Sequence, residues 1–464
     1  MKRIFTAFIA LLIGVMMYAQ PKYIFYFIGD GMGCNEVLAA EMYLAEIQGR
    51  IGIEPLSFAQ FPFSGQLATY SASNGITDSS AAGTCLASGV KTTNHYEGVD
   101  PLGKPAISVA EKLHKAGWAV GVSSTVSIDN ATPAAFYAHV PDRSDAYTIG
   151  TQLANSGYEY FAGATFVRPD HKTDKDLPNL YELCEQNGYT FVHGVKEYRP
   201  GLKKVIMIQE NEGKDIHKAG SGLIPLAISR KAGDMTQRQI VEIGIKQLEN
   251  YDRFFLMSEG GSIDRACHGN DAGTTIHEVI DFADAIQPAI DFYRAHPDET
   301  LIIVTADHET GGMALGNSNV ILNLKALQAQ VASKGSFNYH IRAIKDQYGK
   351  KMTWEQVKEV LKHDLGLYTT TKVSEEEDAM LQALFAKLKK GKSKNIKDLY
   401  GEADELSDAA LALLNKKAKI GWTTRSHTAS PVPIFTIGNG AEKLAGWHDN
   451  KDVAPIILRL VGLE

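Results

Sequence analysis

The sequence predicts an α/β sandwich, with a central and mostly parallel β-sheet, in one large domain that carries a helical insertion. Three observations support this prediction. Six short apolar runs are typical of strands buried on both faces, helical patterns lie between them, and residues 315–421 change to a charged, helical character. With 464 residues, 44% hydrophobic and 22% charged, the chain is long enough for such a domain.

Residues 1–20 predict a secretory signal peptide rather than a membrane span. A basic start is followed by an apolar run over residues 4–18 and by the small residue Ala19. This run is too short for a transmembrane helix, no stop-transfer segment follows it, and no cysteine lies near the cleavage region to carry a lipid anchor. We therefore expect an exported protein, periplasmic or secreted, with no membrane anchor and a mature chain of residues 21–464.

The predicted strands and helices alternate along the mature chain. Helical patterns cover Ile107–Ala116 and Thr236–Tyr251, each of which precedes an apolar run. The six predicted strands are Tyr23–Ile28, Trp118–Val122, Val205–Ile208, Phe254–Met257, Leu301–Val304 and Ile434–Ile437.

The segment 315–421 is predicted to be a helical insertion that caps the core. Thr353–Gln356 and Ser374–Glu377 are capping-box patterns, which are typical of helix starts. An apolar stripe ends before Gly391 and is formed by Leu381, Leu384, Phe385 and Leu388. The sequence leaves open whether the insertion lines a substrate entrance or a dimer interface.

The charge composition limits the classes of molecule that the protein could bind. Residues 1–20 carry two positive charges, so their removal leaves 45 Lys and Arg against 54 Asp and Glu, a net charge of −9. This balance argues against a surface that binds nucleic acid or anionic membrane. The cysteines are compatible either with disulfides in an exported protein or with buried free thiols. They are Cys34, Cys85, Cys184 and Cys267.

The stretch ITDSSAAGTCLASG, residues 76–89, places an acid and two serines before a run of small residues. One interpretation is a capped helix only, because Asp and Ser are preferred caps and Ala propagates a helix. The other is an anion site at the helix N-terminus, where Ser79 would act as a nucleophile toward a bound phosphate. By itself the stretch favours the first interpretation, so the decision depends on groups that could activate the serine.

Carboxylates follow three of the predicted strands. YIFYFIGD ends in Asp30, FFLMSE ends in Glu259, and LIIVTAD ends in Asp307. In an open parallel sheet, ligands bind beyond the carboxyl ends of the strands, and a carboxylate there needs a compensating partner. One such residue is compatible with a helix cap, whereas three indicate a metal site.

Histidines add softer ligands to these carboxylates. Asp264 and His268 are four residues apart, so a helix would place both on one face. With Asp307, the adjacent His308 and the isolated His427, they form a mixed imidazole and carboxylate set that suits zinc.

The remaining ligands are oxygens only. Asp30, Glu259 and the hydroxyl of Thr132 form a hard set that suits magnesium. Arg143, in the same segment as Thr132, offers a planar pair of donors that matches two phosphate oxygens.

Taken together, these residues resemble the alkaline phosphatase family. The resemblance extends over nearly the whole mature chain, in the order of the family. It is carried by FIGDGMG (27–33), ITDSSAAGT (76–84) with GVKT (89–92), NATPAAFYAHVPDR (130–143), EGGSID (259–264) with His268, TADHETGG (305–312) and the pair His427-Thr428.

The resemblance implies a three-layer αβα sandwich, usually a homodimer, that hydrolyses small phosphate monoesters with two Zn²⁺ ions and one Mg²⁺ ion. Ser79 matches the nucleophile and Arg143 the phosphate clamp. The implied metal ligands are Asp30, Asp307 and His308 for one zinc, with Asp30 shared with magnesium; Asp264, His268 and His427 for the other zinc; and Thr132 and Glu259 for magnesium.

Two positions depart from the family pattern. Well-known bacterial members have Asp where Asn130 stands and Lys where Arg265 stands, and animal members have His at both. These side chains touch the magnesium waters and the phosphate. Because Asn130 removes a negative charge, the departure concerns magnesium affinity and the pH optimum rather than the reaction.

Under this interpretation, two zinc ions about 4 Å apart would clamp the entering and leaving oxygens of an in-line displacement. The zinc at Asp30 would lower the pKa of Ser79, and two successive displacements would give retention at phosphorus. A phosphodiesterase or a metal-dependent mutase is an alternative, although a clamp by Arg143 favours monoesters. A phosphate- or metal-binding protein without catalysis is a further alternative, disfavoured because every ligand position is filled.

Overall fold

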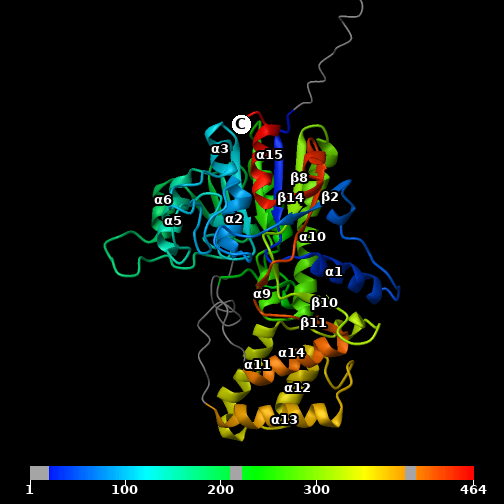
Figure 1. The fold of residues 1–464 in the computed structure, drawn as a ribbon. Coiled ribbons are helices and arrows are strands. Elements are labelled where there is room, and N and C mark those ends of the chain that lie inside the picture. Colours follow the sequence, from blue (N-terminus) through cyan, green and yellow to red (C-terminus); the bar gives the residue numbers. More distant parts are fainter. Residues whose placement is uncertain (1–19, 210–221, 392–403) are drawn as a thin grey trace, which may run out of the picture.

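A ten-stranded β-sheet forms the centre of the computed structural model, which describes residues 20–209, 222–391 and 404–464 (Figure 1). The predicted signal peptide lies outside the described residues, apart from Gln20. The strand order is β14 (Gly446–Asp449), β2 (Phe63–Ala68), β13 (Val432–Gly438), β8 (Thr300–Thr305), β1 (Tyr23–Ile28), β7 (Phe254–Glu259), β3 (Ala119–Ser124), β4 (Tyr160–Gly163), β6 (Val205–Ile208) and β5 (Thr190–His193).

The sheet is mostly parallel, as predicted, and β13 is the exception. It runs antiparallel to both of its neighbours, β2 and β8, while the other paired strands of this sheet run parallel. All six predicted strands are present, with bounds shifted by up to two residues. A buried apolar run does not encode strand direction, so the sequence could not single out β13.

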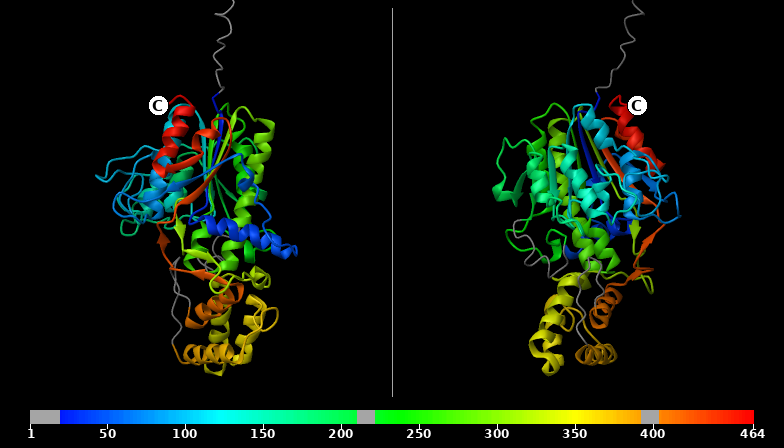
Figure 2. Two further views of the ribbon diagram at one scale, coloured as in Figure 1. Left: turned by 45° about the vertical axis from the view of Figure 1, so that its right-hand side comes forward. Right: turned by 90° about the vertical axis from the view of Figure 1, so that its left-hand side faces the viewer.

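Helices cover both faces of the sheet and make three layers, as predicted (Figure 2). Prediction placed helices over 107–116 and 236–251, and the structure has α3 and α8 there. One face carries α1 (Cys34–Ile47), α8 (Gln237–Leu248) and α10 (Ala272–Ala295); the other carries α2 (Ser79–Ser88), α3 (Val109–Lys115), α4 (Ala131–Ala134) and α15 (Val453–Leu460). The helix α6 (Leu180–Gln186) packs on β5 and on α5 (Ala146–Ser156).

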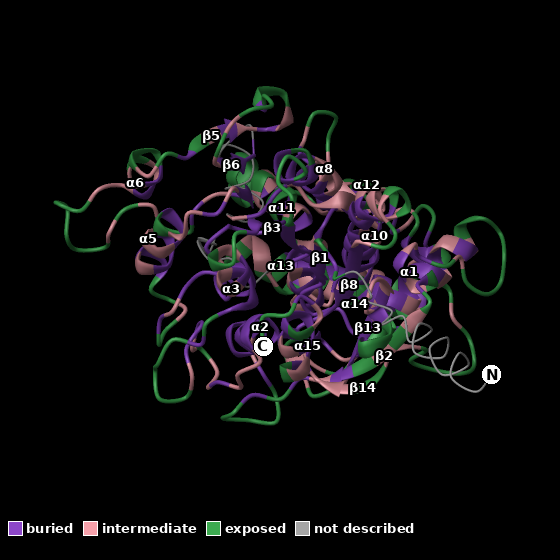
Figure 3. Ribbon diagram, turned by 90° about the horizontal axis from the view of Figure 1, so that it is seen from above, coloured by how far each residue is buried: buried purple, intermediate pink, exposed green. Residues whose placement is uncertain are grey.

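Because helices cover both faces, the central strands are buried along their whole length (Figure 3). In β1 every residue after Tyr23 is buried, and β7 and β8 are buried throughout. The strands that the sequence did not predict are β2 and β14 at one edge and the short β4 and β5 toward the other. The apolar runs of β2 and β14 are interrupted, because both strands are partly exposed to solvent, and β4 and β5 have only four residues each.

Four helices of the predicted insertion lie together beyond one end of the sheet (Figure 1). Both predicted capping boxes are present, at Thr353 and at Ser374. The helices are α11 (Lys334–Tyr348), α12 (Trp354–Leu365), α13 (Glu375–Lys390) and α14 (Glu405–Ala418), and β10 (Met313–Leu315) pairs with β11 (Ile420–Trp422) where the segment leaves and rejoins the core.

The four cysteines are free thiols, so the disulfide alternative does not hold in this structure. Cys34 is exposed and the other three are buried. Among the described residues, no helix combines the length and the apolar character needed to cross a membrane.

Candidate active site

The three carboxylates that follow predicted strands meet at the carboxyl end of the sheet. The strands β8, β1 and β7 are neighbours and run parallel, with Ile28 in register with both Thr305 and Glu259. Their carboxyl ends therefore coincide, and each chain continues into the same region. This register is what brings Asp30, Glu259 and Asp307 together.

Asp30, Asp307 and His308 form the first ligand cluster, with ligand atoms within 4.8 Å of one another. His308 Nε2 lies 3.2 Å from Asp307 Oδ2 and 3.5 Å from Asp30 Oδ1. Neither of these carboxylate oxygens has a hydrogen-bond partner among the described residues. Burial, together with the neighbouring carboxylates, raises the pKa of both aspartates well above its usual range. Crowded acids with unpartnered oxygens fit a bound cation.

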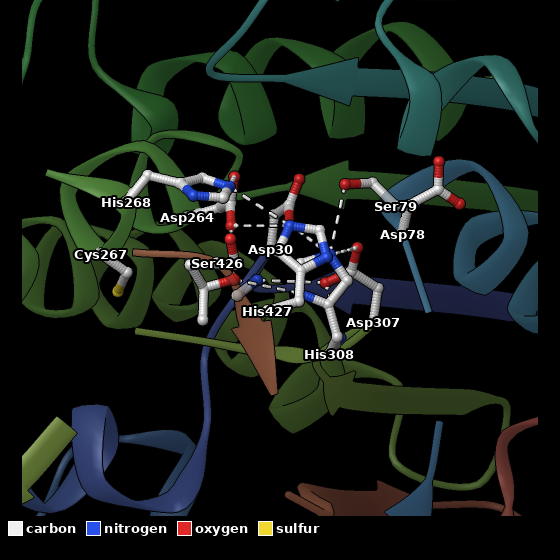
Figure 4. Close-up of polar contacts among 12 residues, drawn as sticks. Asp30, Asp78, Ser79, Asp264, Cys267, His268, Asp307, His308, Ser426 and His427 are labelled. Carbon is white, nitrogen blue, oxygen red and sulfur yellow. Dashed lines mark hydrogen bonds and ion pairs between the residues drawn. The ribbon is translucent and has the colours of Figure 1, made fainter. Parts of the chain in front are cut away.

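Asp264, His268 and His427 form the second cluster, beside the first (Figure 4). The helix α9 (Ser262–His268) carries the first two on one face, as predicted, with 3.3 Å between Asp264 Oδ2 and His268 Nε2. His427 Nε2 is 3.2 Å from His268 Nε2, and the His427 ring stacks on His308 at 3.6 Å between centroids. Burial opposes ionisation of Asp264, but His268, His427 and His308 outweigh it and hold its pKa below the usual range.

Contacts on the far side of each imidazole orient the histidines. His427 Nδ1 lies 2.9 Å from the carbonyl of Thr77, and His268 Nδ1 lies 2.6 Å from that of Arg425. A carbonyl only accepts, so each Nδ1 carries the proton and each Nε2 keeps its lone pair for a metal.

Thr310 links the two clusters. Its hydroxyl donates to Asp264 Oδ1 at 2.6 Å and lies 3.2 Å from His308 Nδ1, from which it accepts. It sits on β9 (Glu309–Thr310), which pairs with β12 (His427–Thr428), so it also joins the segments of His308 and His427. Sequence reasoning missed this threonine, although it stands two residues after His308 in the motif TADHETGG.

Glu259 and Thr132 provide the oxygen-only set. Ser124 Oγ donates to Glu259 Oε2, a contact that the sequence did not predict. The other Glu259 oxygen and the Thr132 hydroxyl have no partner that meets hydrogen-bond geometry among the described residues. Burial raises the pKa of Glu259 to about 7. Unsatisfied oxygens from a carboxylate and a hydroxyl fit a hard cation such as Mg²⁺.

Ser79 is the first residue of α2, which confirms the predicted helix start. Asp78 is the N-cap, and its side chain accepts from the backbone N–H of Ala81 at 3.0 Å. Ser79 Oγ lies 3.2 Å from His308 Nε2, so the hydroxyl points into the ligand clusters (Figure 4). The backbone N–H groups at the start of the helix lie beside it, and a helix N-terminus favours an anion.

The side chain of Arg143 reaches this helix start from the neighbouring segment. Its Nη1 lies 3.5 Å from Asp78 Oδ2, and its Nη2 donates to Asn130 Oδ1 at 3.5 Å. Asn130 is the N-cap of α4, two residues before Thr132. Arg265 follows Asp264 on α9 and is half-buried, and its charge partly offsets the rise that Asp264 causes in the pKa of His268. The structure therefore places all twelve predicted site residues at the carboxyl ends of the parallel strands or on the elements that adjoin them.

A family model described as alkaline phosphatase matches residues 21–161 and 157–463 of the chain. Alkaline phosphatase 3 of Bacillus subtilis is 29% identical over 458 residues, which cover 95% of this chain and 89% of the relative. Alkaline phosphatase 4 of the same organism is 32% identical over 407 residues, covering 83% and 77%.

Solved structures give the same likeness at the level of the fold. The cold-active alkaline phosphatase of Shewanella sp. superposes with a TM-score of 0.76 at 25% identity, covering 95% of this chain and 99% of that one. The alkaline phosphatase of Thermus thermophilus gives a TM-score of 0.77 at 26% identity, with 96% and 92% covered.

Proposed function

The chain belongs to the alkaline phosphatase family and is a phosphatase, and from this premise we propose that it cleaves phosphate monoesters through a phosphoserine intermediate on Ser79. The observation that carries the proposal is the position of the Ser79 hydroxyl. This hydroxyl lies at a buried helix N-terminus. It is 3.2 Å from Nε2 of His308, which belongs to the ligand cluster with Asp30 and Asp307.

The two clusters and the oxygen set fit three cations, and we propose two Zn²⁺ and one Mg²⁺. One zinc would be held by Asp30, Asp307 and His308, the other by Asp264, His268 and His427, and magnesium by Asp30, Thr132 and Glu259. When bound, such ions supply Lewis-acid stabilisation of the entering and leaving oxygens.

The protein groups then have separate tasks. Ser79 Oγ attacks phosphorus, its bond to phosphorus forms as the ester P–O bond breaks, and the substrate leaves as its alcohol. Water then attacks phosphoserine 79 in line, which releases inorganic phosphate and restores the hydroxyl. Arg143 and the N–H groups of the first turn of α2 hold the nonbridging oxygens in both steps.

Three further parts of the proposal concern the whole protein. We propose export to the periplasm or the outside after cleavage near residue 20, assembly as a homodimer, and a role for segment 315–421 as an insertion into the catalytic domain 21–464. The basic start and the short apolar run of residues 1–20 support the first of these.

The decisive experiment is hydrolysis of an aryl phosphate monoester by the mature chain, followed against pH, after metal removal and after separate return of Zn²⁺ and Mg²⁺. We expect alkaline activity that chelation abolishes and zinc restores. A diester with the same leaving group should turn over far more slowly, because Arg143 and the N–H groups of the first turn of α2 would together hold the three nonbridging oxygens of a monoester, and a diester has a substituent on one of them. Faster diester hydrolysis, or phosphate binding with no hydrolysis under any metal, would contradict the proposal.

A further inference from the structure

A buried acid lies behind α2, the helix that begins with the proposed nucleophile Ser79 and that we call the nucleophile helix. This acid has no role in the proposed reaction. Glu97 is 0% exposed, and neither carboxyl oxygen has a partner that meets hydrogen-bond geometry among the described residues. The same is true of the hydroxyl of Ser80, the residue after the nucleophile. Burying a polar group without a partner destabilises the folded state, so two such groups in one place need an explanation.

Glu97 belongs to a segment, residues 94–98, that we call the strap, and the strap is tied to α2. His95 N donates to Asp78 Oδ2 at 2.9 Å, and Gly98 N donates to Thr84 Oγ1 at 2.8 Å. His95 has a φ of 72°, in the left-handed region that a side chain disfavours. The strap therefore holds both the cap and the interior of the nucleophile helix.

The other side of the strap is tied to the segment that carries Arg143. Arg143 N donates to the His95 carbonyl at 2.9 Å. Glu97 and Val140 exchange two backbone hydrogen bonds, of 2.9 and 2.8 Å. The strap thus connects the two parts of the chain that must act together on phosphate, namely the start of α2 and the arginine clamp.

Groups from both of these parts act on the side chain of Glu97. Burial raises its pKa well above the usual range, and the Arg143 guanidinium and the Ser80 hydroxyl oppose this only in part. The carboxylates of Asp78 and Glu259 raise it further. Burial thus favours the protonated carboxyl of Glu97, which can donate a hydrogen bond, while the adjacent Ser80 oxygen can accept.

We propose that Glu97 is a positioning residue for phosphoryl transfer: its carboxyl group, paired with the Ser80 hydroxyl, fixes the first turn of α2 relative to Arg143. This rests on the proposed roles of Ser79 and Arg143. In-line attack requires nucleophile and clamp to be held within a fraction of an ångström, and supporting hydrogen bonds provide that precision. The acid is retained at a cost in stability because it orients the site.

The test replaces Glu97 with Leu, which has a similar volume and no polar atom, and with Gln, which keeps a donor. Each full-length, metal-replete variant is assayed for kcat and KM on an aryl phosphate monoester and for its melting temperature. We expect Glu97→Leu to lower kcat about tenfold while melting no lower than wild type, because burying the Glu97 carboxyl costs at least as much stability as its contact with Ser80 returns. Glu97→Gln should retain kcat within about threefold of wild type.

Two further variants sharpen the result. Thr92→Val removes another fully buried hydroxyl without a hydrogen-bond partner, just before the strap, and should leave kcat and KM unchanged. Adding Ser80→Ala to Glu97→Leu should lower kcat no further than Glu97→Leu alone, since the two groups act as one pair.

Wild-type kcat and KM in Glu97→Leu would overturn the inference. So would a loss of kcat that comes with a lower melting temperature and is not rescued by Gln, because that pattern indicates a merely structural role. A wild-type chain that does not hydrolyse the monoester would instead overturn the proposed function, and this inference with it.

Discussion

Ser79 and Ser80 are adjacent on α2, yet their hydroxyls face different surroundings. Ser79 Oγ lies 3.2 Å from His308 Nε2, whereas Ser80 Oγ is buried on the side of Glu97. We expect Ser79→Ala to lower kcat at least about a thousandfold, because the attacking oxygen is lost. Ser80→Ala, which loses only a supporting contact, should lower it less than about tenfold. Steady-state kinetics on one aryl phosphate distinguishes the two, and equal losses would refute the assignment.

The sequence could indicate site residues whose chemistry is unusual in its context, such as carboxylates directly after buried strands and paired histidines. It could not indicate the residues that orient them. Thr310 and Ser124 are ordinary hydroxyls until the fold places them beside Asp264 and Glu259. The carbonyl of Thr77, which fixes the His427 ring, has no side-chain signature at all. Glu97 reads as a loop residue, and only its burial distinguishes it.

At the scale of elements, α10 carries a buried acid whose effect on stability depends on pH. Burial and the charge of Asp281 raise the pKa of Glu278 to about 8, although it accepts from Ala227 N at 2.7 Å. The unfolded chain releases this proton near the ordinary value for glutamate. The folded state therefore binds more protons between these values, so the free energy of unfolding falls as pH rises through that window and stays lower above it.

Replacing Glu278 with Gln removes this penalty and keeps the acceptor for Ala227. We expect the variant to melt a few degrees above wild type at pH 9 and close to wild type at pH 4. Differential scanning calorimetry at both pH values measures the effect. A variant equally stabilised or destabilised at both would show that the carboxyl does not titrate in this range.

The sequence predicts a strand correctly where helices cover one or both faces of the sheet along the whole strand. The pattern of apolar residues then follows the pattern of burial directly. The central strands β1, β7 and β8 are of this kind. The strand β2, next to the edge strand β14, is only partly covered, with Ser64 and Gln66 exposed, so its sequence FSGQLA carries little strand signal. The direction of β13 depends on the connection that precedes it, which local sequence does not report.

At the scale of the whole molecule, ligands from five separate segments hold the site together only if a cation offsets their charge. Without metal, the carboxylates of Asp30, Asp264, Asp307 and Glu259 repel one another, as the raised pKa of Asp30 records. We expect chelation to lower the melting temperature by about 5 °C or more and zinc to restore it. Calorimetry of chelated and zinc-replenished protein checks this, and an unchanged melting temperature would contradict the proposed metal ligands.

The antiparallel strand β13 of the large sheet also determines when the catalytic centre can form. His427 comes five residues before β13, and β13 must insert between β8 and β2, whose sequence positions are more than one hundred residues earlier. Such non-local pairing forms slowly, because a long loop must close before the contacts stabilise it. A chain lacking its last forty residues would hold Ser79 but neither His427 nor a complete sheet. The second ligand cluster therefore forms only when the C-terminal residues of the chain are present, so completion of the catalytic centre is coupled to completion of the sheet.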